Sequence, residues 1–266
     1  MADVVATDVA VSALMIVRNR ATLIADSIRS VMSQTGPSWE LLVVDDGSVD
    51  DTLTVAHSFA ARDPRVRVLP SCRLGIPATR NRGLAAARGR YLAICDSDDL
   101  SHPGRFAAQA AALDADPGLV GVGSRFRTFI DDPSDAVVAD WRWGLRGGRG
   151  PFAFPTALLR TAAVRAVGGF DPAFPIVEDL DLCYRLSGRG GRFAILPDVL
   201  VDYRISPHGV SQGNPDLFRY AAKAQLRGLR QLHGGFTPVG YLTLMQTLAR
   251  ATRDRYRSRF SRATAR

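Results

Sequence analysis

Cysteine is scarce in this chain, and its spacing excludes a disulfide framework. The three cysteines, Cys72, Cys95 and Cys183, form no CxxC pair and lie far apart in the sequence. Cys95 and Cys183 fall in apolar stretches, which predicts two buried thiols. A chain without a disulfide framework fits a reducing compartment, so we predict a cytoplasmic location.

Long hydrophobic runs are also lacking. The longest apolar stretches fall well short of the length that a membrane-spanning helix requires. At the N-terminus, acidic residues precede the first apolar run, a pattern unlike a signal peptide. With 266 residues, 46% of them hydrophobic and 23% charged, the composition is that of an ordinary globular protein. This length fits one large domain, or one domain with a subdomain.

Acidic residues are nearly absent from the C-terminal tail, and this makes the net charge of +8 uneven. Between Arg250 and Arg266 the chain carries seven arginines and one aspartate, a net charge of +6. The basic character therefore belongs to the tail rather than to a nucleic-acid-binding core. Few aromatic residues alternate with these arginines, and we expect no nucleic-acid partner.

Apolar segments of two kinds alternate along the first half of the chain. Short continuous or alternating runs predict strands, and runs with helical spacing predict helices between them. The expected strands are Val11–Val17, Trp39–Val44, Arg65–Leu69, Tyr91–Cys95 and Leu119–Phe129. The expected helices are Ala21–Ser33, Asp50–Ala61 with a capping box from Ser48 to Asp51, Gly75–Ala87 and Pro103–Leu113. This alternation predicts an α/β fold with a Rossmann-like, mostly parallel sheet flanked by helices.

The second half of the chain is less regular. Asp131–Gly150 is polar and rich in glycine and arginine, which predicts a loop. Glu178–Leu186 has helical spacing, Arg192–Val201 reads as a last strand, and the chain beyond Pro215 is expected to be helical. We therefore predict a main domain over residues 1–212 and a helical, Arg-rich extension over residues 213–266.

Acidic residues follow two of the expected strands at the point where each strand ends. Asp45 and Asp46 come after the second strand, and Asp96, Asp98 and Asp99 come after the fourth. Open α/β sheets bind ligands at the carboxyl ends of their parallel strands, so we expect both groups on the same rim. Neighbouring carboxylates stay ionised together most easily around a hard divalent cation, Mg²⁺ or Mn²⁺. The alternative is that these acids cap turns and the helices that follow.

Five motifs follow one another in order along the chain. They are VSALMIVRNR, WELLVVDDGSVDDT, GIPATRNRGLAAARGRYLAICDSDD, VGGFDPAF and VEDLDLCYRL. Together they resemble the glycosyltransferases of family 2, which have the GT-A fold, and the resemblance extends from Val9 to Ser211. It implies inverting transfer of a sugar from a nucleotide diphosphate donor, with Mn²⁺ or Mg²⁺ as cofactor. A UDP-sugar is the default donor, and a lipid-linked sugar, a polysaccharide, a peptide and a small metabolite stay open as acceptors.

The resemblance also assigns roles to individual residues. Asp96-Ser97-Asp98 corresponds to the DXD motif of the family, with Asp98 as the main metal ligand, supported by Asp96 and by His208. Donor binding falls to Val17, Asp45, Asp46, Arg80, Asp96 and Ser97. Asp179 is the implied general base, and Glu178 orients it or the acceptor. Two alternatives stay open, namely that Glu178 and Asp179 only begin a helix and that Arg80 is a solvated helix arginine.

One segment departs from the family pattern. After the first strand the family usually carries a proline and an aromatic residue, where this chain has Ile16-Val17-Arg18. The sequence therefore does not predict that the nucleotide base stacks on an aromatic ring at this position. Three alternatives stay open for Arg18, namely that it contacts a phosphate, lies against the plane of the base, or points to water. A nucleotidyltransferase is expected to have a Gly-rich phosphate loop after the first strand. This chain has Arg18-Asn19-Arg20 there, without a glycine, which argues against that class of enzyme. The other alternative is a non-catalytic protein that binds nucleotide sugars.

Acceptor recognition is expected in Asp131–Pro155 and in the helices after Pro215. In the first segment, Trp141 and Trp143 either stack on a sugar or an apolar carrier, or pack the loop onto the domain. In the second, one helical face carries residues four apart, namely Leu248, Thr252, Tyr256 and Phe260. Arginines occupy much of the remaining surface of that helix. One alternative is that this helix lies on an anionic membrane, which would make the chain a peripheral protein at the inner face of the membrane. The other is that the helix packs on its own domain or on a partner chain.

Overall fold

Strands and helices alternate along the chain in the order that the sequence predicts. The computed structural model describes residues 9–70, 72–139, 145, 149–206, 214, 216–232 and 235–263, with the backbone alone at 239 and 252–263. The strands are β1 (Val11–Val17), β2 (Trp39–Asp45), β3 (Val66–Leu69), β4 (Tyr91–Asp96), β5 (Leu100–Ser101), β6 (Leu119–Phe129), β7 (Val137–Val138), β8 (Leu158–Arg160) and β9 (Arg192–Arg204).

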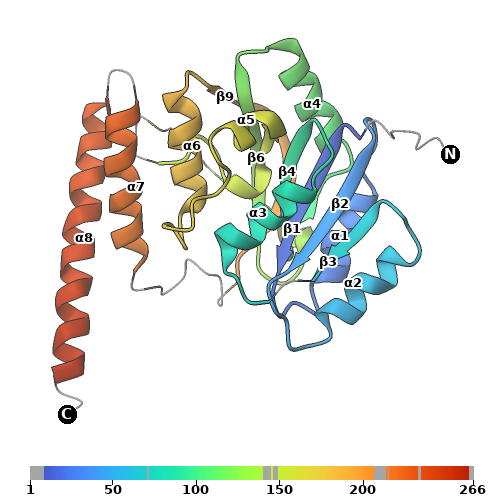
Figure 1. Cartoon of the computed structure of the whole chain (residues 1–266), viewed down its shortest axis with the longest axis horizontal. Coiled ribbons are helices and arrows are strands. Elements are labelled where there is room, and N and C mark those ends of the chain that lie inside the picture. The colour runs from blue at the N-terminus through green and yellow to red at the C-terminus, as the bar shows by residue number, and fades with distance from the viewer. Residues whose placement is uncertain are drawn as a thin grey trace.

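Helices cover both faces of the sheet that these strands form (Figure 1). They are α1 (Ile24–Met32), α2 (Thr52–Ala60), α3 (Ile76–Ala86), α4 (Arg105–Ala115), α5 (Thr161–Ala166), α6 (Glu178–Gly188), α7 (Leu217–Gln231) and α8 (Pro238–Ala263). Two short 3₁₀ turns, Pro133–Asp135 and Phe154–Thr156, lie between β6 and β8. The predicted helices are present, and several begin two or three residues later than expected.

The described residues form one sheet with the order β3-β2-β1-β4-β8-β6-β9-β5, and β7 pairs with β6. Its first four strands are parallel, as predicted, and β9 is parallel to β6. The difference from the prediction is β8, which is inserted antiparallel between β4 and β6. In the described residues, the connection from β6 to β8 contains no crossover α-helix, so the chain turns back instead of crossing over the sheet.

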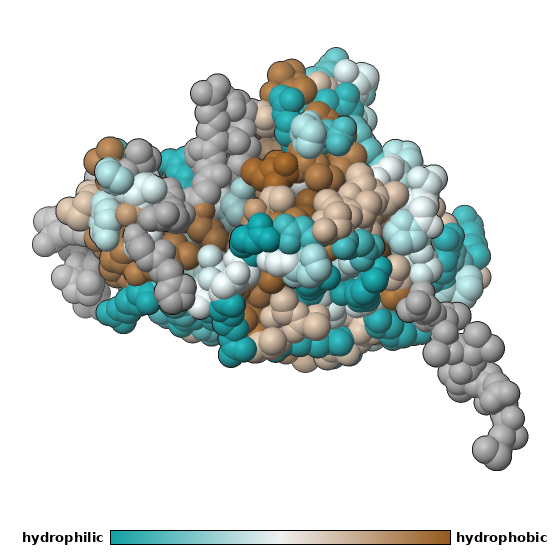
Figure 2. Space-filling model, turned by 90° about the horizontal axis from the view of Figure 1, so that it is seen from above, coloured by the Kyte–Doolittle hydropathy of each residue, from teal (hydrophilic) through white to brown (hydrophobic). Residues whose placement is uncertain are grey.

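The two C-terminal helices pack against the same body. The ring of Tyr184 in α6 stacks on Phe236, with the ring centroids 6.0 Å apart, and Leu232 and Leu244 belong to the same core cluster. Leu248 packs against this cluster too, which agrees at this position with the alternative that the helix packs on its own domain. Seen from above, hydrophobic residues reach the surface at the end of the molecule where α7 and α8 lie (Figure 2). Within the described residues, no helix is long and apolar enough to cross a bilayer.

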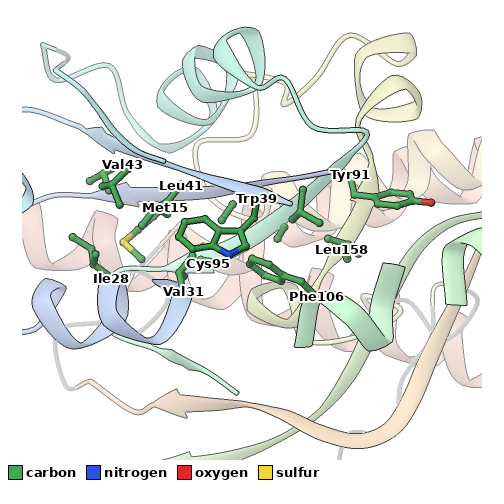
Figure 3. Packing of buried hydrophobic residues seen from close by; sticks show 14 of the residues in the cluster. Met15, Ile28, Val31, Trp39, Leu41, Val43, Tyr91, Cys95, Phe106 and Leu158 are labelled. Carbon is green, nitrogen blue, oxygen red and sulfur yellow. The ribbon is translucent and has the colours of Figure 1, made fainter. Parts of the chain in front are cut away.

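Alternating side chains of the central strands form two core layers. In β1, Ala13 and Met15 face the layer with α1, α2 and α4, whereas Leu14 faces the layer with α3, α5 and α6. Strands buried on both faces read as continuous apolar runs, which is why the sequence located them so well. Figure 3 shows the first layer, where Met15 lies among Ile28 of α1 and Val43 of β2.

One predicted local motif is wrong. Ser48 and Asp51 form no capping box, because the Ser48 hydroxyl accepts the backbone N–H of Asn19 at 2.9 Å. The carboxylate of Asp50 instead accepts the backbone N–H of Thr52 at 3.1 Å, at the start of α2. The loops after β1 and β2 are therefore tied to each other, and this fixes one edge of the ligand-binding rim.

Candidate active site

A cavity of about 810 Å³ opens at the carboxyl ends of β1, β2 and β4. The parallel register places Asp45 opposite Val17 and Asp96 opposite Ile16, which confirms the shared rim that the sequence predicts. The residues with predicted roles that line the cavity are Val17, Asp46, Arg80, Asp96, Ser97, Asp98, Glu178 and Asp179. Residues far apart in the sequence thus meet around one space.

The acidic end of β4 divides into two parts. Asp96 and Asp98 line the cavity, whereas Asp99 is buried and its Oδ1 accepts the backbone N–H of Arg204 at 2.8 Å. Burial, with Asp96 close by, raises the pKa of the Asp99 carboxyl well above its ordinary value. Burial also raises the pKa of Asp96, although the charge of Arg80 opposes this. Two carboxylates of this segment therefore face the cavity, and the third anchors the turn.

The acids after β2 also separate into two roles. Asp45 does not line the cavity, and its Oδ2 accepts the backbone N–H groups of Gly47 and Ser48, both at 3.0 Å. It shapes the turn, as one of the two sequence hypotheses has it. Asp46 lines the cavity, and its Oδ1 accepts the Leu74 N–H at 2.7 Å and the Thr79 hydroxyl at 2.8 Å.

Arg80 is a buried cation in the wall of the cavity. Its guanidinium lies 3.1 Å from the Glu178 carboxylate and 3.7 Å from that of Asp96. The rings of Phe154 and Phe170 lie 5.0 and 5.5 Å from it. These contacts fix the side chain by charge and by cation–π attraction. The alternative of a solvated helix arginine is therefore wrong.

Helix α6 begins with the predicted acid pair, and the residue before it is strained. Val177 has φ +60° and ψ +27°, the left-handed region that β-branched residues rarely adopt. This conformation turns the chain so that Glu178 and Asp179 enter the cavity at the start of the helix. Strain of this kind costs about 1–3 kcal/mol and is held in place by surrounding structure, often at functional sites.

The two acids of α6 have different surroundings. Burial raises the pKa of Glu178 to about 7, although the adjacent charge of Arg80 opposes the shift. Burial also raises the pKa of Asp179, and Arg80 again acts in the opposite direction. Glu178 is paired with Arg80, whereas no ion pair of Asp179 is present among the described residues. Of the pair, Asp179 is thus the carboxylate better placed to accept a proton from a ligand.

Several residues at the cavity were missed from the sequence. The Nε of Arg20 lies 3.5 Å from the Asp98 carboxylate. The side chain of Arg204 donates to the carbonyl oxygen of Asp98 at 3.2 Å and to those of Ile130 and Asp131 at 2.9 and 3.1 Å. Arg20 follows β1 and Arg204 is the last residue of β9. Their positions at the ends of strands were the one sequence feature that could have indicated a place at the cavity.

The carboxylates at the cavity could hold a divalent cation whose remaining ligands are water and phosphate oxygens. Within the described ranges, no group of three or more His, Cys, Asp or Glu side chains is arranged to hold a metal. The carboxylates of Asp96 and Asp98 nevertheless face the same cavity, and each lies near one arginine. Mg²⁺ and Mn²⁺ sites commonly use one or two carboxylates and complete their coordination with water and phosphate oxygens. The residues present fit such a site, whereas His208 lies outside the described residues, as do Trp141 and Trp143.

A comparison with known proteins places these features in a family. A model described as "Glycosyl transferase family 2" matches residues 12–161, more than half of the chain. The chain belongs to glycosyl transferase family 2. EpsE of Bacillus subtilis is 30% identical over 212 residues, covering 73% of this chain and 72% of EpsE. The succinoglycan biosynthesis protein ExoO of Rhizobium meliloti is 37% identical over 215 residues, covering 73% of this chain and 60% of ExoO.

Solved structures share the fold of this family 2 glycosyltransferase. TarS 1-349 of S. aureus in complex with UDP-GlcNAc has a TM-score of 0.67 at 17% identity, covering 93% of this chain and 72% of that chain. The mannosyltransferase PcManGT of Pyrobaculum calidifontis, in complex with GDP-Man and Mn²⁺, has a TM-score of 0.66 at 21% identity, covering 94% and 74%. The GT-A fold that the resemblance implies is confirmed.

Proposed function

We propose that this glycosyltransferase moves a sugar from a nucleotide diphosphate sugar to a hydroxyl acceptor in one displacement that inverts the anomeric carbon. One observation carries the proposal. The acids at the end of β4, Asp96 and Asp98, and the acids that begin α6, Glu178 and Asp179, line a single cavity. One pair serves the donor, and the other serves the acceptor.

The donor lies along the ends of β1, β2 and β4 in this proposal. Val17 and Asp46 contact the nucleoside, and Ser97 with Asp96 lies near the ribose and diphosphate. Arg80, and Arg20 beside Asp98, supply fixed positive charge for the diphosphate. TarS and PcManGT bind UDP-GlcNAc and GDP-Man, which supports a nucleotide sugar as the donor class, and we take a UDP-sugar as the first to test.

Asp98, supported by Asp96, would hold Mn²⁺ or Mg²⁺. A divalent cation at this position supplies charge that neutralises the leaving diphosphate. The complex of PcManGT contains Mn²⁺, which supports a metal in the donor site of this fold. We keep His208 as a proposed further ligand on the resemblance alone.

The chemical step needs a base on the side of the sugar opposite the diphosphate. Asp179 takes the proton of the acceptor hydroxyl while that oxygen forms a bond to the anomeric carbon. The bond from the anomeric carbon to the diphosphate oxygen breaks, and the electron pair leaves with the nucleoside diphosphate. Glu178, paired with Arg80 at 3.1 Å, orients Asp179 or the acceptor.

We further propose that residues 1–212 form the catalytic domain and that residues 213–266 are an extension anchored to it. Contacts of Leu232 and Leu244 with the core, and of the Tyr184 ring with Phe236, support that anchoring. A cytoplasmic location remains our proposal, and it agrees with the three free cysteines.

A donor panel tests the proposed reaction. The full chain is incubated with UDP-, GDP- and dTDP-sugars, with and without Mn²⁺, and release of nucleoside diphosphate is measured with water or simple glycosides as acceptors. We expect metal-dependent release from one donor class and a product of inverted anomeric configuration by NMR. Release of a sugar 1-phosphate would instead indicate transfer of the nucleotidyl group, as in a nucleotidyltransferase, and donor binding without release would indicate a non-catalytic protein.

A further inference from the structure

Helix α8 exposes apolar side chains on the face that points away from α7. Leu242 and Met245 are 58% and 63% exposed, and Tyr241 beside them is 47% exposed. Leu244 and Thr247, on the opposite side of the helix, are buried. Because the outward positions recur at helical spacing, they form one stripe rather than scattered surface residues.

The sequence continues this stripe into the basic tail. After Tyr241 and Met245, the same spacing of three or four residues reaches Ala249, Thr252, Tyr256 and Phe260. Seven arginines and one aspartate fall between Arg250 and Arg266, as the sequence shows. An apolar stripe on a helix whose C-terminal half is rich in arginine is a pattern of helices that lie in the interface of a membrane.

We propose that α8 docks the protein on an anionic membrane surface. Phosphate headgroups complement the net charge of +6 in the tail, and the acyl region accepts Leu242 and Met245. A second copy of this chain would bring two arginine-rich helices together, so like charges oppose a dimer along α8. A nucleic acid would pair with the arginines but would leave the apolar stripe in water.

The position of α8 in the molecule agrees with this role. It lies at the edge, beside α7, and its C-terminal part extends past the N-terminal start of α7 (Figure 1). Leu217 at the start of α7 contributes to the wall of the cavity that also holds Asp179. Docking through α8 therefore holds the cavity near the bilayer while the sheet stays in water.

Vesicle flotation of the full chain tests the proposal. Vesicles of phosphatidylcholine alone are compared with vesicles that also contain phosphatidylglycerol, and we expect binding to the anionic vesicles that weakens as salt rises. The double variant Leu242→Gln, Met245→Gln is expected to lower the partition constant by at least about tenfold. Replacing Arg253, Arg255, Arg257 and Arg259 by glutamine is expected to lower it by about fivefold for each arginine.

A matched control changes two exposed apolar residues elsewhere. Val137 and Val138 in β7 are 67% and 45% exposed, and their double glutamine variant is expected to bind vesicles like the parent. Thermal melting should be unchanged in Leu242→Gln, Met245→Gln and in the control, because their altered side chains are exposed. Equal vesicle binding by the parent and the α8 variants would overturn the proposal. A dimer in light scattering that Leu242→Gln, Met245→Gln dissociates would overturn it in favour of a second copy.

Discussion

The two sides of the cavity are built in different ways. The wall that we propose for the donor, called the donor wall here, lies at the ends of β1, β2 and β4, and its carboxylates stand where strands end. The wall that we propose for the acceptor, called the acceptor wall here, lies at the start of α6 and the end of β9 and depends on contacts between distant segments. Val177 adopts a left-handed conformation there, and Arg204 links the acidic turn to the residues after β6. The donor wall is thus set locally, and the acceptor wall is set by tertiary structure.

A large expected effect separates two neighbouring acids after β4, of which Asp98 alone lines the cavity. Asp98→Asn should lower kcat/KM by about 100-fold or more, since in the proposed reaction this carboxylate would hold the cation that neutralises the diphosphate. Asp99→Asn should cost less than about tenfold, because this buried carboxyl, whose pKa is raised, faces away from the cavity and Asn keeps the acceptor for the Arg204 N–H. Steady-state kinetics with the active donor measure both, and equal losses would show that the two acids share one role.

The next effect concerns the link between the walls. Arg204→Met removes three hydrogen bonds to backbone carbonyls, and we expect the free energy of unfolding to fall by about 2 kcal/mol. Arg192 in the same strand makes an exposed ion pair with Asp116, and Arg192→Met should cost at most about 1 kcal/mol. Urea denaturation compares them, and equal costs would mean that Arg204 is an ordinary surface arginine.

A smaller effect measures the strain before α6. Val177→Gly should raise the free energy of unfolding by about 1 kcal/mol, because glycine adopts a positive φ freely. Its neighbour Ile176 has an ordinary φ, and Ile176→Gly should lower stability by about 1 kcal/mol. Urea unfolding gives both values. A destabilised Val177→Gly variant would mean that the packing of the valine outweighs its strain.

The pH dependence of the acceptor wall gives the smallest expected change. Burial raises the pKa of Asp179 above its ordinary value of 3.8, and the charge of Arg80 opposes this. The base acts as a carboxylate, so kcat/KM should decline as pH falls through this raised pKa. In Arg80→Met the opposing charge is gone, and the acidic limb should move to higher pH. Arg20→Met, which alters the partner of Asp98, should lower the rate without moving the limb.

The donor wall was largely predictable from the sequence. Strands buried on both faces read as apolar runs, and the acids at their ends, Asp46 and Asp96 among them, follow directly in the chain. Parallel order then brings those ends to one rim. The shared cavity of Asp98 and Asp179 followed from the resemblance to the family, because no local pattern relates residues so far apart.

The rest depended on contacts that a sequence does not display. The Ser48 hydroxyl accepts a hydrogen bond from the backbone N–H of Asn19 in another loop, instead of capping the helix that follows it. The side chain of Arg204 is held in place by hydrogen bonds to carbonyl groups that lie more than 70 residues away in the chain. The strain at Val177 also has no local signal, since valine is among the residues least suited to a positive φ. The spacing of Leu248 left open whether its helical face meets a membrane or the protein itself, and the structure shows Leu248 packed against the core.

Asp179→Asn, with donor affinity and turnover measured separately, tests the central claim most directly. If Asp179 deprotonates the acceptor, kcat should fall by about 10²- to 10⁴-fold while the dissociation constant for the donor, from calorimetry, stays close to that of the parent. Turnover like that of the parent would contradict the account, and so would a loss of donor binding that matches the loss of turnover.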